Sequence, residues 1–446
     1  MLLFHYYRPD DVVGARHMTE LAEGLARRGW DVTASPCNRG CRDESRVYPA
    51  HEELDGVRVR RVWRPPLTQR TTLGRMLNAT WMITAWGAAS VARARPDVIL
   101  IGAEPVMSVL VALVWRLFHP RTRIVHWCFD LYPEAAIADS LLRPGSLPVS
   151  LLTRLVRAAY HRCDLIADMG PCMSSKLERY RSPARTTTLT PWALVEPSEP
   201  LPVSRSERAN LFGNASFGLL YSGNFGRAHS YEPVLALARH ISDTSIAFAF
   251  SIRGNCESAV RSAVSPSDRN ITIVPFAPEG DLADRLSAAD VHIVTLKPGW
   301  TGTVVPSKFF GALAVGRPVL FCGDSESSIA RWIHQHQVGW VLQSDSDIPR
   351  IASELKSLAG DPARRTDLNA RCHRVYRDFF GREQILARWN TELRQLLVPR
   401  SSALADRFLA TTNPPTPLPP TLPKRRTEQS PRDVAESGPV ENPDCS

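Results

Sequence analysis

The chain has 446 residues, with 54 Lys or Arg against 45 Asp or Glu, so its formal net charge is 54 − 45 = +9. At 43% hydrophobic and 22% charged residues it can form two or three domains with large cores, which excludes a wholly disordered or collagen-like chain. The basic excess is diffuse and contains no Lys/Arg block. It therefore suits an anionic substrate or an anionic membrane surface better than a nucleic acid.

The nine cysteines form no CxxC pair, and no His/Cys partners follow Cys37 and Cys41 at zinc-finger spacing. We therefore expect reduced thiols, no metal and no cofactor. The apolar start of the chain reads as a strand, not as a signal peptide. Residues 98–118 are long enough to span a bilayer, but Glu104-Pro105 interrupts them, which favours a buried strand followed by a helix. The sequence thus predicts a cytoplasmic protein without a membrane span.

The first half of the chain alternates between strand and helix patterns. An apolar run at 2–7 precedes a loop with Gly14, an amphipathic helix at 15–28 and a strand at 30–35. This order is the βαβ unit of a doubly wound parallel sheet. Further strands are predicted at 98–102, 123–128 and 165–168, with helices between them that end near residue 118 and cover about 151–163.

The second half repeats the pattern, with strands predicted at 217–221, 246–252, 270–275, 291–296 and 318–322, and helices at 232–240, 281–289 and 306–315. A proline-rich segment at 191–204 separates the halves. The fold class predicted is α/β, with two Rossmann-like doubly wound domains, 1–190 and 205–382, facing each other across a cleft. A terminal helix within 383–400 could pack on either domain, and the Pro-rich tail 401–446 is predicted to be disordered.

Two loops of the second half have the composition of a phosphate site. Ligands of open parallel sheets bind at the carboxyl ends of the strands, where helix N-termini present free N–H groups. In the loop 222–227, Gly223 and Gly226 allow close backbone approach to a diphosphate, and Arg227 adds a bidentate donor. Ser307 and Lys308 open a predicted helix, where an ammonium is unfavourable unless an anion is bound.

Simpler explanations of these residues stay open. Gly14 can be a turn glycine, Gly223 and Gly226 ordinary loop glycines, and Lys308 a solvated surface lysine. Other nucleotide-dependent classes lack support, because the chain has no GxxxxGK[ST] loop and no strand-linked GxGxxG followed by an acidic residue. The absence of GxSxG also disfavours an α/β-hydrolase.

Four segments resemble one family of enzymes. They are YYRP at 6–9 with Gly14, FDLYPE at 129–134, YSGNFGRAH at 221–229, and VPSK at 305–308 running on to LAVGRPV at 313–319. In combination they are similar to GT-B fold glycosyltransferases of the retaining group 4. Within that group they most resemble bacterial polysaccharide-assembly enzymes of the fucosamine or colanic-acid transferase type.

The resemblance implies two sets of site residues. Donor-binding residues would be Gly14, Gly223, Asn224, Arg227, Ser307 and Lys308. Catalytic residues would be Asp130, Arg227 and Lys308, acting without a metal on the developing charge of the leaving diphosphate. If configuration is retained, that phosphate can deprotonate the acceptor, and Asp130 or His126 would orient the acceptor or support charge on the sugar. A plain loop carboxylate at 130 and a plain strand histidine at 126 are the alternatives.

The sequence departs from the family pattern at three places. The usual Glu-x7-Glu pair aligns with Thr303 and Gly311, although the second Glu would grip the nucleotide ribose. A histidine frequent after the fourth strand of the first domain aligns with Phe129. In the second-domain glycine loop, Asn224 and His229 stand where many relatives have Arg and Lys.

The function expected is transfer of a sugar from a nucleotide-sugar donor to a polysaccharide or lipid-linked acceptor. A nucleotide-sugar epimerase and a catalytically silent GT-B scaffold are the alternatives. One apolar helix bears on location, because it lies near Arg70 and Arg75 and could rest against the inner face of the cell membrane. Its large side chains, which could equally be ordinary core, are Trp81, Met82, Ile83 and Trp86.

Overall fold

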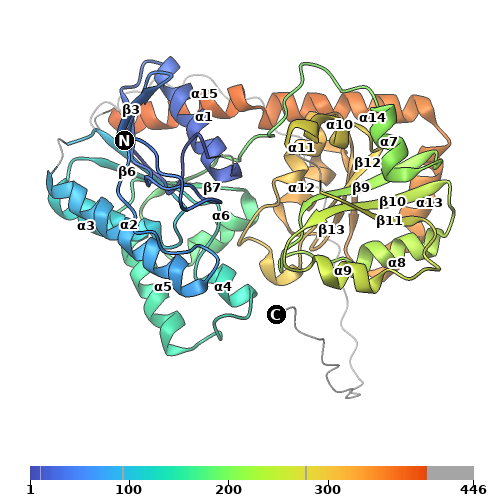
Figure 1. Ribbon diagram of the computed structural model, residues 1–446, viewed down its shortest axis with the longest axis horizontal. Coiled ribbons are helices and arrows are strands. Elements are labelled where there is room, and N and C mark those ends of the chain that lie inside the picture. The colour runs from blue at the N-terminus through green and yellow to red at the C-terminus, as the bar shows by residue number, and fades with distance from the viewer. Residues whose placement is uncertain (11, 93–94, 277–278, 399–446) are drawn as a thin grey trace, which may run out of the picture.

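A computed structural model describes residues 1–10, 12–92, 95–276 and 279–398 (Figure 1). It contains two separate sheets of mostly parallel strands, each flanked by helices. This is the predicted fold class of two Rossmann-like domains. The tail expected to be disordered, 401–446, lies outside the described residues.

The first sheet has eight strands in the order β3-β4-β2-β1-β5-β6-β7-β8. Its strands are β1 (Leu2–Leu3), β2 (Val32–Ala34), β3 (His51–Leu54), β4 (Val57–Arg60), β5 (Val98–Gly102), β6 (Arg123–Trp127), β7 (Leu165–Asp168) and β8 (Arg185–Thr188). The strands predicted at 98–102 and 165–168 are confirmed at those bounds. The hairpin of β3 and β4, which are the antiparallel pair of this sheet, was not predicted.

The first strand is shorter than predicted. Only Leu2–Leu3 forms β1, yet His5 N donates to Glu104 O at 3.1 Å and Cys37 N donates to His5 O at 2.9 Å. Residues beyond Leu3 therefore continue along the neighbouring strands without a regular ladder. The apolar pattern predicted their burial correctly, but it could not show where the ladder ends.

The second sheet has six parallel strands in the order β11-β10-β9-β12-β13-β14. They are β9 (Phe217–Asn224), β10 (Ile246–Arg253), β11 (Ile271–Val274), β12 (Val291–Thr295), β13 (Val319–Cys322) and β14 (Gly339–Leu342). β9 extends three residues beyond its predicted end, so the predicted loop glycine Gly223 stands within the end of the strand.

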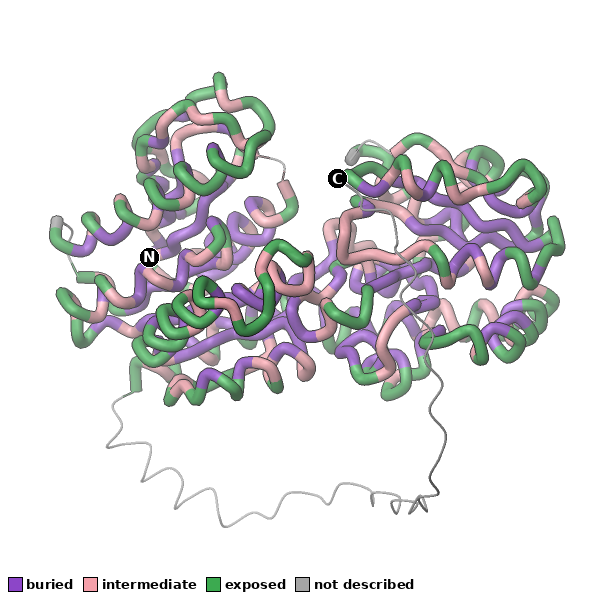
Figure 2. Tube along the Cα trace, turned by 90° about the horizontal axis from the view of Figure 1, so that it is seen from below, coloured by how far each residue is buried: buried purple, intermediate pink, exposed green. Residues whose placement is uncertain are grey.

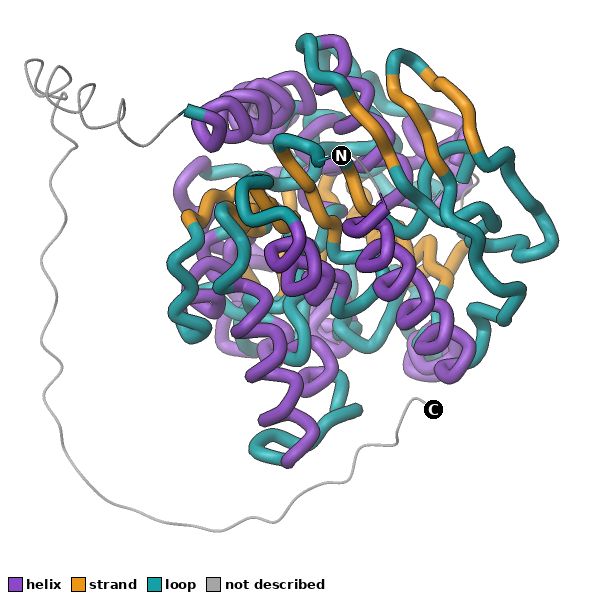
Figure 3. Tube along the Cα trace, turned by 90° about the vertical axis from the view of Figure 1, so that its left-hand side faces the viewer, coloured by secondary structure: helices purple, strands orange, loops and turns teal. Residues whose placement is uncertain are grey.

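Helices flank both sheets, as the view from the first domain's end shows (Figure 3). In the first domain they are α1 (Val13–Arg27), α2 (Thr72–Ala92), α3 (Val111–Phe118), α4 (Glu134–Ala138), α5 (Leu147–Tyr160) and α6 (Pro171–Glu178). In the second they are α7 (Arg205–Phe212), α8 (Glu232–Ile241), α9 (Glu257–Ala263), α10 (Leu282–Ser287), α11 (Lys308–Ala314), α12 (Ser328–His336), α13 (Ile348–Ala359) and α14 (Pro362–Val375). Among the described residues, none of the helices has both the length and the hydrophobicity to cross a bilayer.

The last helix, α15 (Arg382–Leu397), follows the second domain in sequence but packs on the first (Figure 1). Trp389 and Leu386 are fully buried in the first domain's core. At the rim, Trp30 Nε1 donates to Asn390 Oδ1 at 2.9 Å and Arg28 pairs with Glu383 at 2.6 Å. This packing decides between the two positions that the sequence left open.

Each domain has its own core. The central strands of both sheets are buried beneath helices whose outer sides are exposed, whereas the edge strands β3, β8 and β11 are partly exposed (Figure 2). Between β8 and α7 the chain forms neither helix nor strand, and its start packs on both domains: Trp192 belongs to the core of the first and Ala193 to a core of the second. The eight cysteines among the described residues are free thiols.

Candidate active site

A pocket of about 500 Å³ lies between the two domains, within the range of about 300–1,000 Å³ that small-molecule sites occupy. The first domain contributes the start of α1, Arg42 and residues 192–195. The second contributes the carboxyl ends of β9 and β10, part of α10 and the start of α11. The pocket thus lies at the carboxyl edge of the second sheet, where ligands of doubly wound folds bind.

The lining of this pocket is basic on one part and apolar on another. Its charged side chains are Arg16, Arg42, Arg253 and Lys308, and no Asp or Glu is among the described residues that line it. Its apolar wall is formed by Phe276, Leu282, Leu286 and Ile293. The Arg253 guanidinium lies 4.1 Å from the centre of the Phe276 ring, so cationic and apolar surfaces meet there. Such a lining suits a ligand with an anionic part and a flat, weakly polar part.

Lys308 is the cation at the start of α11. Its Nζ donates to Asn224 O at 3.1 Å and lies 5.1 Å from the centre of the Tyr221 ring. The surrounding protein removes water from this ammonium and lowers its pKa to about 8. No carboxylate pairs with it in the described part of the chain. A bound anion would supply the missing counter-charge.

Gly223 makes room for Lys308. Its φ of +138° is a backbone conformation that favours glycine, and a Cβ built there would lie 2.5 Å from Lys308 Cε. The glycine therefore has a specific function in placing the lysine, beyond that of an ordinary loop residue.

We expect Gly223→Ala to displace the Lys308 side chain and to weaken binding of a nucleoside diphosphate at least about tenfold, since one charged hydrogen bond is worth about 1.5–3 kcal/mol. Isothermal titration with UDP and GDP measures this. Gly213→Ala is the matched control, because Gly213 also has positive φ (+56°) but an added Cβ meets nothing within 4 Å. Equal losses in both variants would attribute the effect to backbone strain.

Four of the predicted donor-binding residues meet in this pocket. They are Gly223, Asn224, Ser307 and Lys308, from β9 and the start of α11. The sequence missed Arg16, Arg42 and Arg253, which also line it. No local motif marks those arginines. Arg16 and Arg42 reach the pocket because the two domains face each other, and Arg253 stands at the end of β10, beside β9.

The other three predicted site residues do not line the pocket. Gly14 is the second residue of α1, and a Cβ there would lie 3.0 Å from Phe4 and 3.4 Å from Glu104. Arg227 pairs across the domains with Asp139 at 3.5 Å. Gly14 and Arg227 therefore form contacts within the protein near the cleft. Their roles in donor binding stay predictions.

Asp130 lines a small recess in the first domain together with His126, Tyr132 and Tyr160. The Asp130 side chain is exposed at this recess, and partial removal of water by the surrounding protein raises the pKa of its carboxyl to about 6. Glu104, which sequence reasoning used only as a helix breaker, has a pKa raised to about 7 by the enclosing protein and by the charge of Asp130. The first domain therefore presents two carboxyls whose pKa values are raised toward neutral pH.

His126 is a strand residue. Its Nδ1 lies 3.0 Å from Ile101 O, and burial lowers its pKa to about 4, so the ring is neutral at physiological pH. Its position is thus that of a plain strand histidine, which was one of the two alternatives that the sequence left open.

Sequence comparison relates the chain to known glycosyltransferases. Residues 14–192 match the model of the Glycosyl transferase 4-like domain. The chain is 26% identical over 282 residues to the probable glycosyltransferase WbjE of Pseudomonas aeruginosa, covering 60% of this chain and 69% of that one. It is 23% identical over 350 residues to the putative colanic acid biosynthesis glycosyl transferase WcaI of Escherichia coli K12, covering 73% and 83%. These matches support a group 4 GT-B glycosyltransferase of the polysaccharide-assembly type.

Solved structures support the same fold. Sucrose-phosphate synthase from Thermosynechococcus elongatus superposes with a TM-score of 0.66 at 18% identity, covering 89% of this chain and 98% of that one. Anabaena Alr3699/HepE in complex with UDP and glucose has a TM-score of 0.62 at 12% identity, covering 88% and 99%. The resemblance to group 4 enzymes of polysaccharide assembly, inferred from four short segments, is confirmed.

The two positions aligned with the expected Glu pair carry no carboxylate. Gly311 lines the pocket, and a Cβ there would approach only Leu286, at 3.7 Å. Thr303 is buried, and its hydroxyl donates to Trp300 O at 2.7 Å. The pocket therefore has open space at Gly311, and Thr303 is turned into the protein.

His229, aligned with a basic position of relatives, is not a cation here. Its Nδ1 lies 2.7 Å from Thr295 O, and burial together with the nearby Lys308 charge lowers its pKa to about 3. Of His229 and Lys308, only Lys308 therefore carries a positive charge.

Proposed function

We propose that this glycosyltransferase transfers a sugar from a nucleotide-sugar donor to a polysaccharide or lipid-linked acceptor, in the pocket between its domains. The observation that carries the proposal is the lining itself. Arg253 at the end of β10, Lys308 at the start of α11, and Arg16 and Arg42 of the first domain suit a diphosphate, and the apolar wall at Phe276 suits a nucleobase. HepE, which shares the fold, has been solved with UDP-glucose.

The chemistry follows from where charge develops. As the bond between the sugar and the diphosphate breaks, negative charge grows on the leaving phosphate. Lys308, Arg16 and Arg253 are held by contacts to Asn224 O, to Leu194 O and to the Phe276 ring before the reaction, so they can stabilise that charge without rearrangement. With retention of configuration, the leaving phosphate accepts the proton of the attacking hydroxyl on the same face of the sugar. Because these cations can stabilise the leaving diphosphate, we expect the reaction to need no metal. Measuring sugar transfer in the presence of EDTA tests this expectation.

The recess with Asp130 belongs to the acceptor side in this proposal. A carboxylate there can accept a hydrogen bond from an acceptor hydroxyl, or stabilise positive charge on the sugar in the transition state. Since a nucleotide sugar is a multiply charged donor that does not cross a bilayer, we place the reaction in the cytoplasm, with the enzyme held at the inner face of the membrane.

We expect Asp130→Asn to lower transfer at least about tenfold, with donor binding unchanged, because amide replacement removes the negative charge and keeps the shape. The raised pKa sets the sign of the pH dependence: transfer by the unmodified enzyme should fall as pH drops below about 6, where Asp130 becomes protonated. The variant should lose that decline. Asp31→Asn, at the opposite end of the first sheet, is the control, and unchanged transfer by Asp130→Asn would exclude the proposed role.

The decisive experiment measures free nucleotide. The enzyme is incubated with UDP- and GDP-sugars, with and without extracted lipid-linked acceptors, and released UDP or GDP is quantified. Release that requires an acceptor supports transfer, whereas donor sugars that interconvert without one indicate an epimerase. The open space at Gly311, where a Glu was expected, favours another candidate function, a catalytically silent scaffold. Such a scaffold would bind nucleotides but release no UDP or GDP. The anomeric configuration of the product, read by NMR, tests retention.

A further inference from the structure

Three helices of the first domain carry an unusual share of the exposed apolar surface. α2, α3 and α5 lie side by side beneath the first sheet, on the side away from α1 and α15 (Figure 1). They contain 11 of the 20 large apolar side chains that are exposed among the described residues. We call them the three-helix face: Leu73, Met76, Leu77, Trp81 and Val91 of α2, Val114, Leu117 and Phe118 of α3, and Leu147, Leu151 and Leu155 of α5. Such clustering indicates a surface that contacts something apolar.

The helix that the sequence singled out contributes to both core and surface. Met82 and Trp86 are fully buried, Ile83 is half-buried, and Trp81 is 42% exposed. Trp81 packs edge-on against the exposed Trp63, with ring centres 5.1 Å apart. One side of α2 is therefore ordinary core, and its opposite side is exposed, as contact with a membrane requires.

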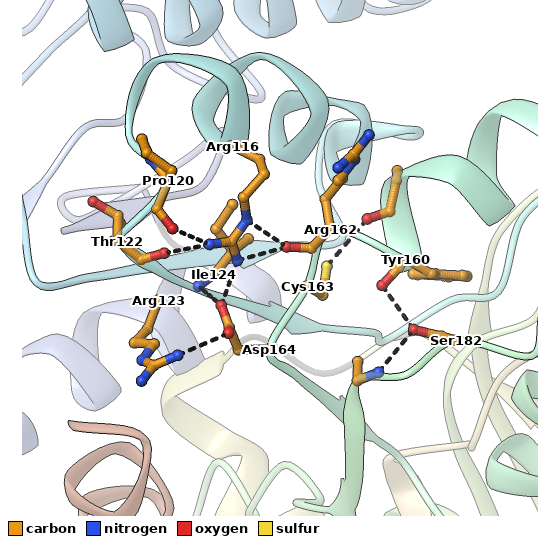
Figure 4. A network of polar contacts seen from close by, with 12 residues as sticks. Arg116, Pro120, Thr122, Arg123, Ile124, Tyr160, Arg162, Cys163, Asp164 and Ser182 are labelled. Atoms are coloured by element: carbon orange, nitrogen blue, oxygen red, sulfur yellow. Dashed lines mark hydrogen bonds and ion pairs between the residues drawn. The ribbon is translucent and has the colours of Figure 1, made fainter. Parts of the chain in front are cut away.

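The three-helix face is held in a fixed arrangement. Trp115 Nε1 of α3 donates to Trp86 O of α2 at 2.9 Å. Arg116 of α3 donates to Arg162 O, just beyond α5, at 2.8 Å and pairs with Asp164 at 2.5 Å (Figure 4). Because Arg116 is used for these contacts, it joins the helices and does not serve the outer surface.

The charge on this face has one sign. α2, α3 and α5 contain no Asp or Glu at all. Exposed arginines lie among the apolar side chains, at Arg75 on α2, at Arg154 and Arg157 on α5 and at Arg143 just before α5. Within the described residues, the guanidinium groups of Arg143, Arg154 and Arg157 have no ion-pair partner. Apolar side chains mixed with unpaired cations match an anionic bilayer surface.

We propose that the three-helix face rests on an anionic lipid bilayer, with its leucines and Trp81 at the boundary of headgroups and acyl chains and its arginines on lipid phosphates. A second copy of the chain fits less well. A two-fold contact would press the same face against itself and oppose arginines to arginines, with no acidic side chain on the three helices to pair with them.

The position of the face connects it to the proposed acceptor side. From Asp130 the chain forms α4, passes Asp139, which contacts the second domain through Arg227, and then enters α5. The loop and helix that carry the recess therefore lead directly to the membrane-facing helix. This placement deepens the proposed function, since a lipid-linked acceptor held in the leaflet would reach the cleft from the first domain.

The test is flotation with lipid vesicles of known composition, using the full chain. We expect binding to vesicles containing phosphatidylglycerol at low salt and little binding to pure phosphatidylcholine. Leu147→Glu with Leu151→Glu should weaken binding at least about 100-fold, because two inserted leucines are lost. Arg154→Gln with Arg157→Gln should weaken it about 30-fold, with less dependence on salt, because two cations worth about 1 kcal/mol each are lost. Phe379→Glu and Arg374→Glu, both exposed on the second domain, are the matched controls and should bind like the unmodified chain.

Several results would overturn this assignment: no vesicle binding by the unmodified chain at low salt, equal binding to both lipids, or undiminished binding by the leucine variant. A concentration-dependent dimer that the leucine variant abolishes would instead make the face a contact between copies. Vesicle binding needs no donor, so it fails separately from the proposed function. UDP binding and the melting temperature, measured for every variant, show whether the pocket and the fold are intact.

Discussion

Replacing Lys308 by alanine is expected to lower sugar transfer by about 10²-fold or more, because one preorganised charged donor at a developing anion is typically worth that much. The structure gives the reason a residue-specific basis. The Lys308 ammonium lies against Asn224 O and Gly223, in a pocket that no acidic side chain lines among the described residues. Nothing in that surrounding neutralises the charge, so it is available to the ligand.

The melting temperature of Lys308→Ala should not fall, since the lysine forms no ion pair with described residues and its charge is partly desolvated without compensation. Lys297→Ala is the matched control, because Lys297 is exposed just after β12 and does not line the pocket. Transfer by folded Lys308→Ala at the rate of this control would remove Lys308 from the mechanism.

The lowered pKa of Lys308 adds a pH signature to the same variant. Without an anion the ammonium loses its proton as pH rises through about 8, so binding of UDP should weaken above that pH by up to tenfold per unit. Lys308→Ala should bind weakly at all pH values and lack this decline. Titration calorimetry in buffers of different ionisation enthalpy would also detect the proton taken up on binding.

The second-domain half of the pocket could be predicted because its signals are local. A glycine at the end of an apolar strand and a Pro-Ser-Lys start of a helix indicate a strand end and a helix start, and the doubly wound fold places such points at one edge. Gly223, Ser307 and Lys308 were found this way, and Asn224 was implied by the family resemblance. Even their mutual contact follows from topology, since β9 is central in the sheet.

The rest of the pocket depends on contacts between distant segments. Arg16 and Arg42 come from the first domain, and Arg253 from the end of β10 in the second. Arg227 shows the opposite case, because its position in a glycine loop predicted a phosphate ligand, whereas its side chain pairs with Asp139 of the other domain. A sequence pattern cannot decide which partner a long side chain reaches.

The sequence also could not show which side of a helix is buried. α2 is apolar nearly all round, so its pattern fits a core helix and a membrane-contacting helix equally well. Only packing separates the buried Met82 and Trp86 from the exposed Trp81. The terminal helix posed the same difficulty at a larger scale, because its apolar residues indicate burial without naming the domain that buries them.

That helix gives the largest stability effect we expect. Trp389 of α15 is fully buried in the first domain's core, and its ring lies edge-on to Trp127 with centres 5.1 Å apart. Trp389→Ala should destabilise the first domain by about 3–5 kcal/mol, the range for removing a large buried aromatic side chain. Thr391→Ala, on the exposed side of the same helix, should stay within about 0.5 kcal/mol. Urea unfolding followed by circular dichroism measures both.

Trp389→Phe separates the packing of the ring from its polar group. The Trp389 Nε1 hydrogen is buried and finds no hydrogen-bond partner among the described residues, so phenylalanine removes an unsatisfied donor as well as some apolar volume. The two changes oppose each other, and the phenylalanine variant should lose much less stability than the alanine variant.

Since α15 leaves the second domain and completes the core of the first, Trp389→Ala should also loosen the geometry of the cleft and lower transfer more than its stability loss alone explains at 25 °C. Equal stability of the alanine and unmodified proteins would show that α15 is not part of the first domain's core in solution.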